Sequence, residues 1–251
     1  MNGKSDKVRF DEYLAAEKLV GSRHQAADLI KRGQIKLNGR TVTKPSLRLD
    51  PGLKQRVQLK TGQLYVSRAG YKLAAAAETL GVNFKGKVVL DAGAHLGGFT
   101  DVIYQRRAAA IVAVDVGKEP LAAHLRQKDN ILSFNRTDIR DFDWPGQLSL
   151  PDIIVADLSF ISLTKVLAGL QRFCRPGTAV LVLAKPQFEA EGYDLQGGVV
   201  KNNLQRRAIF RRLEGWFKEN GWAVAGKADS KVAGLKGNLE RFYLLRPPVK
   251  R

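Results

Sequence analysis

One stretch near the middle of the chain constrains the fold more than any other. Residues 86–101 read GKVVLDAGAHLGGFTD, in which an apolar segment leads through Asp91 into a glycine-rich turn. Further along, AAIVAVDVG forms a second apolar segment that ends at Asp115. A strand, a glycine-rich turn, a helix start and a strand ending in an acid are the layout of a mononucleotide-binding βαβ unit. An ordinary tight turn between a strand and a helix is the alternative.

The spacing of the glycines in this turn indicates which ligand it would suit. They fall at Gly93, Gly97 and Gly98, whereas a dinucleotide-binding turn has the pattern G-x-G-x-x-G. The second glycine of that pattern, which makes room for a pyrophosphate, is missing. A nucleoside without a pyrophosphate therefore suits the turn better, and S-adenosylmethionine is such a ligand. Asp115 could accept hydrogen bonds from its ribose hydroxyls.

Apolar and amphipathic segments alternate from residue 67 onward, which predicts an α/β fold. Such alternation gives a mostly parallel, Rossmann-like sheet of seven strands with helices on both faces. The last two strands have no helical pattern between them and are expected to form an antiparallel hairpin. Strands are expected at 87–91, 110–115, 131–134, 152–157, 178–184, 222–228 and 239–245, and helices near 70–81, 97–106, 119–127, 162–173 and 203–219.

The first 60 residues predict a small separate α+β domain, with residues 61–66 as a linker to a domain over 67–251. FDEYLAAEKL places Phe10, Leu14 and Leu19 roughly on one helical face. A second helix is expected after Ser22 as its N-cap, with Gly33 ending it. The sequence QIKLNGRTV, with Asn-Gly between two apolar segments, predicts a β-hairpin, and RVQLK a further strand.

The charge of the chain points to a polyanionic partner. The net charge is +18 over 251 residues, and the small N-terminal part is the denser in Lys and Arg. Nucleic acid is the usual partner of such a chain, with an anionic membrane as the rival. No apolar run is long enough to span a bilayer, and MNGKSDKVRF has no signal-peptide core. The single cysteine, Cys174, fits a reducing cytoplasm, and with three histidines a zinc or other metal site is not expected.

Four charged residues stand where a plain core would not place them. Lys72 begins an alanine-rich helix, Asp157 and Lys185 end two buried strands, and Glu240 begins the last strand. Ligands of open α/β sheets bind beyond the carboxyl ends of the strands, so Asp157 and Lys185 are expected to face the same cleft as the glycine-rich turn. Each could instead be a charge at the solvent boundary. Together, two lysines held by two carboxylates could lower the pKa of a ribose 2′-hydroxyl and stabilise the charge that develops on it.

The order of these motifs resembles a known family. SRAGYKL, DAGAHLGGFTD, VDVG, DLSFISL, KPQFE, GGVV and GNLE are similar to the TlyA family of rRNA 2′-O-methyltransferases, labelled haemolysin A and related to FtsJ. The N-terminal part is similar to an S4 RNA-binding domain. The resemblance covers roughly residues 8–246. It implies that the cofactor is S-adenosylmethionine and that the substrate is rRNA or a ribosomal subunit. The implied target nucleotide is cytidine.

The resemblance also assigns residues to roles. The catalytic set falls on Lys72, Asp157, Lys185 and Glu240. The implied cofactor contacts are Asp91, Gly93, Ala94, His95, Gly97, Gly98, Phe99, Asp115, Val116, Asp138, Ile139 and Asp157. The implied RNA contacts are Arg9, Ser22, Arg23, Lys31, Arg32, Lys36, Asn38, Lys44 and Arg68.

The chain departs from the family pattern at three places. His95-Leu96 stands where the family usually has Ser-Thr, Lys231 where it has Pro, and Asp138 where it often has Asn. Two other functions stay open at this point. One is an RNA-binding protein that has lost catalysis, and the other is a membrane-active haemolysin, for which the basic amphipathic segment 203–219 is the candidate.

Overall fold

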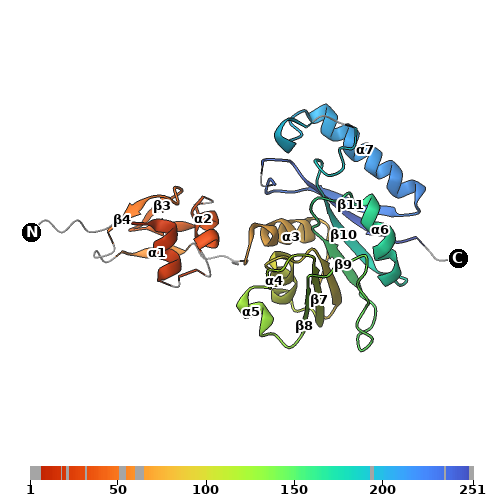
Figure 1. Ribbon diagram of the computed structural model, residues 1–251, viewed down its shortest axis with the longest axis horizontal. Helices are drawn as coiled ribbons and strands as arrows, with labels where there is room; N and C mark the ends of the chain where they lie inside the picture. Colours follow the sequence, from red (N-terminus) through yellow and green to blue (C-terminus); the bar gives the residue numbers. More distant parts are fainter. Residues whose placement is uncertain are drawn as a thin grey trace, which may run out of the picture. The chain divides into compact units, whose positions relative to one another are not determined.

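The computed structural model describes residues 7–17, 19–20, 23–31, 33–50, 55–59, 65–192, 195–234 and 236–248. The chain forms two compact units, Met1–Val66 and Ser67–Arg251 (Figure 1). Each is described below by itself.

The first unit is a small α+β fold. In chain order it contains β1 (Val8–Arg9), α1 (Phe10–Ala16), α2 (Arg23–Lys31), β2 (Ile35–Leu37), β3 (Arg40–Val42), β4 (Arg48–Leu49) and β5 (Val57–Leu59). Strands β3, β2 and β5 form one antiparallel sheet, and β1 pairs with β4. Apolar residues of both helices, with Ile35, Leu37 and Leu49, make its core.

The expected hairpin is confirmed and the expected first helix is corrected. Leu37 pairs with Arg40 across Asn38 and Gly39, which both have positive φ, as a two-residue turn of this kind requires. Leu19, expected on the buried face of the first helix, is 41% exposed. The reason is that α1 ends at Ala16 and the amide of Leu19 turns back to the carbonyl of Leu14. Ser22, the expected N-cap of α2, lies outside the described residues.

The second unit is built on the expected seven-stranded sheet. The strands are β6 (Val88–Ala92), β7 (Ala110–Asp115), β8 (Ile131–Asn135), β9 (Ile153–Ala156), β10 (Ala179–Ala184), β11 (Ala223–Asp229) and β12 (Arg241–Arg246). Their spatial order is β11-β12-β10-β9-β6-β7-β8. Only β12 runs against its neighbours, so the antiparallel hairpin at the end of the chain is confirmed and β12 lies between β10 and β11.

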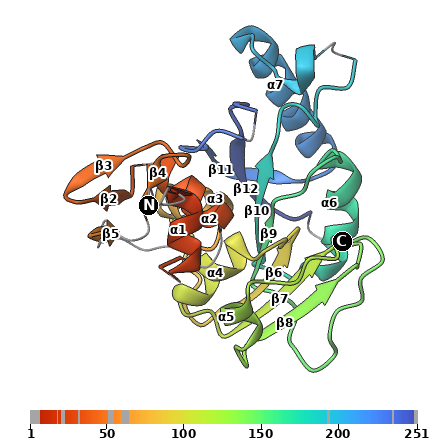
Figure 2. The ribbon, with the colours of Figure 1, turned by 60° about the vertical axis from the view of Figure 1, so that its left-hand side comes forward.

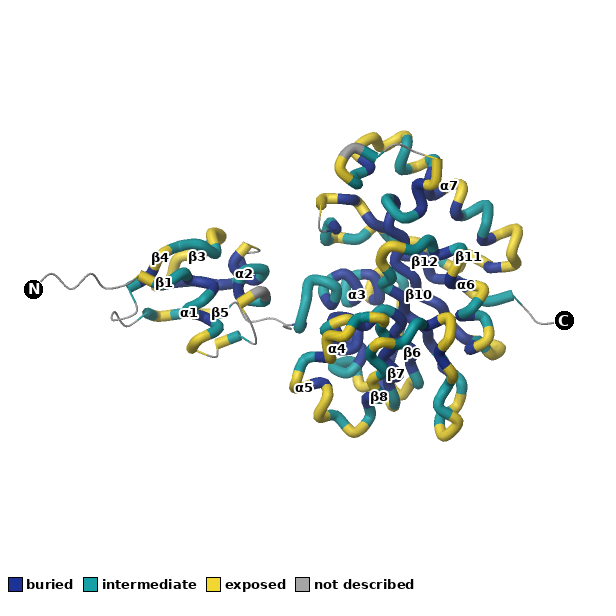
Figure 3. Tube along the Cα trace, viewed as in Figure 1, coloured by how far each residue is buried: buried dark blue, intermediate teal, exposed yellow. Residues whose placement is uncertain are grey.

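Helices cover both faces of this sheet. They are α3 (Arg68–Thr79), α4 (Gly98–Gln105), α5 (Ala123–Arg126), α6 (Thr164–Leu170) and α7 (Asn203–Glu219), with 3₁₀ turns η1 (Gln171–Phe173) and η2 (Gln196–Gly198). Side chains of α6 and α7 pack into one core cluster with alternate residues of the strands. Helices α3 and α4 lie side by side away from α6 (Figures 1 and 2). The central strands are buried along almost their whole length (Figure 3).

Three elements differ from the sequence prediction in ways that matter for the site. The helix expected over 119–127 is only Ala123–Arg126, because Pro120 precedes it and Ala122 is extended, with its amide bonded to the Leu96 carbonyl. Strand β9 ends at Ala156, one residue earlier than expected, and strand β12 begins at Arg241, two residues later than expected. Asp157 and Glu240 therefore lie just outside the sheet, each next to the end of its strand.

Candidate active site

The predicted catalytic residues lie along one edge of the sheet. In the sheet, Ala92 of β6 pairs with Ala156 of β9, and Ala184 of β10 pairs with Arg241 of β12. Asp157 and Lys185 each follow the last residue of a parallel strand, and Glu240 precedes the first residue of the antiparallel one. Gly93 follows β6 at this same edge. A run of four neighbouring strands thus presents the glycine-rich turn, a carboxylate, a lysine and a second carboxylate at the carboxyl end of the sheet.

Lys185 is buried and is held in an ion pair with a partly exposed carboxylate. Its Nζ lies 2.7 Å from Oδ1 of Asp157 and donates a hydrogen bond of 2.8 Å to Oγ of Ser159. The side chain is 9% exposed, and Nζ also lies 5.9 Å from the ring centre of Phe188. Ser159 was missed by the sequence analysis, although its place in DLSFISL was the available signal. The Lys185 ammonium is therefore fixed in position, because it contacts the charged Asp157 carboxylate and the neutral Ser159 hydroxyl.

Lys72 forms the second ion pair, in which both side chains are buried. Its Nζ lies 2.5 Å from Oε2 of Glu240, which is 168 residues away in the chain and 2% exposed. The other oxygen of Glu240 lies so close to Gly234 that a Cβ there would be 2.5 Å from it. Arg68 donates to the Ala233 carbonyl at 2.8 Å, which ties the start of α3 to this same loop. Within the described residues, no hydrogen bond or ion pair joins this pair directly to the Lys185 pair.

The glycine-rich turn has the features of a ligand cradle. Gly93 and Gly97 have φ of +86° and +95°, and a Cβ on Gly93 would lie 2.7 Å from the Asp157 carbonyl oxygen. Only glycine permits so close an approach between the turn and the residue that holds Lys185. His95, the departure from the family pattern, also has positive φ, and its side chain is exposed.

Asp91 lies fully buried beneath this turn. Its Oδ2 accepts a 2.6 Å hydrogen bond from the Thr100 hydroxyl, while Oδ1 is buried with no hydrogen-bond partner among the described residues. Burial raises the pKa of Asp91 to about 7, and the charge of Asp157 adds to the rise. A buried acceptor of this kind beneath a turn of glycines fits a ligand that brings a donor or a positive charge.

Asp115 has a second role that the sequence did not reveal. Its two oxygens accept hydrogen bonds from the backbone amides of His95, at 2.9 Å, and Gly117, at 2.6 Å. The carboxylate therefore holds the glycine-rich turn to the end of β7. Each oxygen keeps a further lone pair for a ribose hydroxyl. The neighbouring Val116 is an exposed apolar side chain, as a surface for a flat ring would be.

The other implied cofactor residues are divided between the core and the surface. The Phe99 ring is buried and stacks on Phe242 with centroids 6.1 Å apart, so only its backbone is left for a ligand. Ile139 is also buried. Asp138 pairs with Arg140 at 2.6 Å, which lowers the pKa of its carboxyl. The remaining implied residues, Ala94, Gly97 and Gly98, form the turn itself and the start of α4.

An exposed aromatic residue beside the lysine pair was not found from the sequence. Phe160 is 92% exposed, has a φ of +65°, and packs against Phe188 with ring centroids 5.3 Å apart. Both rings line an open cleft of about 1010 Å³, together with Gln187, whose Oε1 is buried without a partner among the described residues. The signal in the sequence was one phenylalanine in each of the two motifs that carry Asp157 and Lys185.

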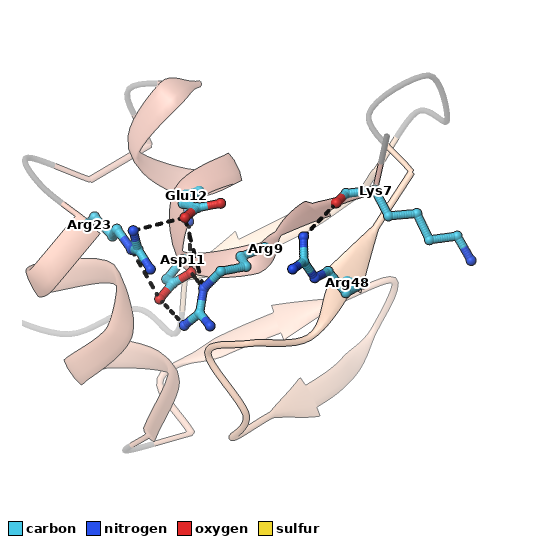
Figure 4. Close-up of polar contacts among 6 residues, drawn as sticks. All are labelled: Lys7, Arg9, Asp11, Glu12, Arg23 and Arg48. Carbon is cyan, nitrogen blue, oxygen red and sulfur yellow. Dashed lines mark hydrogen bonds and ion pairs between the residues drawn. The ribbon is translucent and has the colours of Figure 1, made fainter. Parts of the chain in front are cut away.

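The implied RNA contacts of the first unit fall into two groups. Arg9 donates two hydrogen bonds to the buried Asp11, and Arg23 pairs with Glu12 at 2.8 Å and with Asp11 at 3.5 Å (Figure 4). The hydrogen bonds from Arg9, and the charges of Arg9 and Arg23, lower the pKa of Asp11. These two arginines thus also stabilise α1 and α2.

The second group is less tied to the fold. Asn38 bonds across to Gln55 and the Arg56 amide and so holds the hairpin turn. Lys31 and Lys44 are exposed, Lys36 is half-buried, and none of the three forms an ion pair within the described part of the chain. Arg32, like Ser22, lies outside the described residues.

Two further properties concern ions and membranes. Within the described residues, no three His, Cys, Asp or Glu side chains gather to hold a metal ion. In the same part of the chain, none of the helices has the length and apolar character needed to cross a bilayer.

Comparison with known proteins decides the family. Residues 65–246 match the FtsJ-like methyltransferase family, and residues 8–54 match the S4 domain. The chain is 35% identical over 246 residues to the 16S/23S rRNA (cytidine-2'-O)-methyltransferase TlyA of Mycobacterium tuberculosis, covering 98% of this chain and 92% of that one. The chain belongs to the TlyA family.

Other members of this group carry a different name. Hemolysin A of Brachyspira hyodysenteriae is 33% identical over 237 residues, covering 93% of this chain and 97% of its own length. A solved structure described as a putative hemolysin from Streptococcus thermophilus superposes with a TM-score of 0.74 at 32% identity, covering 97% of this chain and 90% of that one. The second unit of this TlyA-family chain is a methyltransferase whose cofactor is S-adenosylmethionine.

Proposed function

We propose that this TlyA-family protein transfers a methyl group from S-adenosylmethionine to the 2′-hydroxyl of a cytidine ribose in rRNA. The observation that carries the proposal is the Lys185–Asp157 pair, which is fixed at the edge of the sheet against the glycine-rich turn. The two cytidine methyltransferases among its relatives support the choice of substrate.

The residues of the turn would hold the cofactor. Asp115 would accept hydrogen bonds from its ribose, and Gly93 and Gly97 would let the backbone approach it. Bound there, S-adenosylmethionine supplies a methyl group on a positively charged sulfur. Asp91, with its free acceptor atom, would sit beneath the positively charged part of this ligand.

Lys185 would act on the ribose. Its ammonium, oriented by Asp157 and Ser159, would donate a hydrogen bond to the 2′-oxygen and stabilise the negative charge that grows there. The oxygen–methyl bond forms as the sulfur–methyl bond breaks with its electron pair left on sulfur, and the hydroxyl proton passes to water. Lys72 and Glu240, buried against each other, would fix the side of the site next to β12. Positioning of this kind provides much of the rate of such in-line transfers.

The aromatic pair would receive the base. A target nucleotide inside folded RNA has to leave its stack to reach a buried lysine, and an exposed aromatic ring can replace the lost stacking. Phe160, held at positive φ beside Ser159, is placed for this.

Substitution of Phe160 tests this placement. Phe160→Ala should lower methyl transfer at limiting RNA by about tenfold or more, because one base–aromatic stack is worth roughly 1–3 kcal/mol. Phe160→Trp should keep most of the activity. Equal loss in both variants, or no loss in either, would remove the ring from the RNA site.

The S4-type unit would bring the enzyme to rRNA in the cytoplasm. Its exposed lysines suit phosphate contacts. Loss of catalysis is disfavoured because both lysine–carboxylate pairs are intact. Membrane lysis is disfavoured because the apolar face of α7 is buried in the core.

The direct test is a map of ribose methylation. Ribosomal RNA from cells with and without the protein should differ at one or a few 2′-O-methylated cytidines. Purified protein with radiolabelled S-adenosylmethionine should restore the same positions in vitro. Label in protein, lipid or the base, rather than in ribose, would contradict the proposal.

A further inference from the structure

The longest helix of the described chain carries five cationic side chains, some of which bond within the fold while others do not. These are Arg206, Arg207, Arg211, Arg212 and Lys218, all on α7. Arg206 lies 3.7 Å from Asp229, and Arg212 donates to the backbone carbonyls of Glu189 and Glu191. These two arginines are therefore engaged within the fold.

The other three cations point away from it. Arg207, Arg211 and Lys218 are exposed, and their side chains form no hydrogen bond or ion pair with any described residue. At 3.6 residues per turn they fall within about 40° of one another around the helix, on a line roughly 16 Å long. We call these three residues the α7 stripe.

Nearby acidic residues do not neutralise the stripe. Of the two acids of α7, Glu214 is turned toward the sheet, where it accepts hydrogen bonds from Lys227 and Tyr243. Glu219 directly follows Lys218 and therefore points about 100° away from it around the helix. Arg207 and Arg211 stand four residues apart, a like-charge spacing that costs a helix a few tenths of a kcal/mol. An anionic partner would offset that cost.

The stripe begins at the edge of the sheet that carries the active site. Helix α7 follows β10, whose carboxyl end leads to Lys185, and β11 after it runs parallel to β10. The helix must therefore start at the Lys185 edge and run to the opposite one. Its lead-in segment is fastened beside Glu240, because Asn238 exchanges hydrogen bonds with Val200, at 2.9 Å, and Gly198, at 3.0 Å.

We infer that the α7 stripe binds the phosphates of the RNA strand that flanks the target nucleotide. This inference rests on the proposed function and adds a second RNA-contact surface, on the methyltransferase unit itself. The positive charge of the stripe favours binding to the phosphates of RNA. The cations also form a line that leads away from the catalytic edge, which suits a strand that flanks the target nucleotide. A lipid surface is disfavoured, since Phe210, Leu213 and Phe217, the residues that would have to enter it, are at most 3% exposed.

The test compares two triple variants of the full chain. The first, Arg207→Gln/Arg211→Gln/Lys218→Gln, removes the stripe. The control, Lys85→Gln/Lys87→Gln/Arg107→Gln, removes three exposed cations next to the starts of β6 and β7, at the opposite edge of the sheet. Both lose three charges, and a thermal melt should show both folded.

Binding to a fluorescein-labelled rRNA transcript is measured from 50 to 300 mM KCl. Without the stripe, we expect affinity at the lowest salt to fall about tenfold or more, and the slope of log affinity against log salt to shrink by about 1–2, as for the loss of two or three phosphate contacts. The control should change much less. Arg207→Lys/Arg211→Lys should retain the slope, because phosphates are neutralised by either cation.

Three outcomes separate the possibilities. Equal slopes for the stripe variant and the control would overturn the inference. Binding to phosphatidylserine vesicles that depends on the stripe, with unchanged RNA binding, would overturn it in favour of a membrane. Methyl transfer by the unaltered protein is assayed in parallel, so that its absence counts against the proposed function and not against the stripe.

Discussion

Lys185 is the residue on which the proposed chemistry depends most. Lys185→Ala removes an ammonium held by Asp157 and Ser159 without touching the glycine-rich turn. Methyl transfer in a single turnover at saturating rRNA should fall by at least ~10², the scale of a positioned charge-stabilising group. Lys185→Arg should fail nearly as badly, because the wider planar guanidinium does not fit the same pair of partners.

A control distinguishes chemistry from folding. Lys87→Ala, an exposed lysine before β6, should leave transfer unchanged. If Lys185→Arg turned over normally, or if activity fell only in step with melting temperature, Lys185 would be a structural residue.

Asp91 makes stability depend on pH. Its pKa is raised to about 7 by burial, while in the unfolded chain it is near 3.8. Between these values the unfolded state releases a proton that the folded state keeps, so the free energy of unfolding falls as pH rises, by up to about 1.4 kcal/mol per pH unit. Below pH 4 and above pH 7 this contribution no longer changes.

The neutral variant Asp91→Asn should lack this dependence. Its melting temperature relative to the unaltered protein should rise steadily from pH 5 to pH 7 and then level off. A difference that is constant over this range would mean that Asp91 is ionised in the folded protein throughout. The melts are best made without cofactor, since a bound cation would lower the pKa of Asp91.

At the scale of elements, the glycine-rich turn and β7 act together. Asp115 holds the turn through the His95 amide, and the proposed cofactor ribose would share the same carboxylate. Asp115→Ala should therefore weaken cofactor binding by roughly 1.5–3 kcal/mol. Asp115→Asn, which keeps one acceptor oxygen, should lose less.

Calorimetric titration with S-adenosylmethionine measures both effects. Asp129→Ala, an exposed acid in the turn before β8, serves as the control and should bind normally. Unchanged affinity in Asp115→Ala would take this residue out of the cofactor site and leave it with its turn-holding role alone.

At the scale of the whole molecule, the two units divide the work of binding and chemistry. Deleting residues 1–60 should leave a folded methyltransferase unit, because its core does not draw on those residues. Cofactor affinity should be retained. RNA affinity should fall sharply and its salt dependence should become shallower, since fewer phosphates are neutralised. Full RNA binding by the truncated chain would contradict this division.

The amino-acid sequence alone was enough to predict the order and type of the elements in the second unit. Strand, turn and helix signals there are local, so the βαβ layout, the terminal hairpin and the full extent of α7 could be predicted from periodicity alone. It also placed Asp157 and Lys185 at one edge, because parallel strands end together. The family motifs supplied Lys72 and Glu240, which no local pattern brings together.

The partner of each polar group, in contrast, could be seen only in the folded protein. Lys72 meets Glu240 across 168 residues, Asp115 holds a turn formed earlier in the chain, and Arg9 and Arg23 are bound by acids of α1. The tertiary structure also separated the engaged cations of α7 from the exposed ones and left Phe160 open beside the lysine. Burial and hydrogen-bond partners depend on segments that are distant in sequence, and these contacts leave no trace in spacing or periodicity.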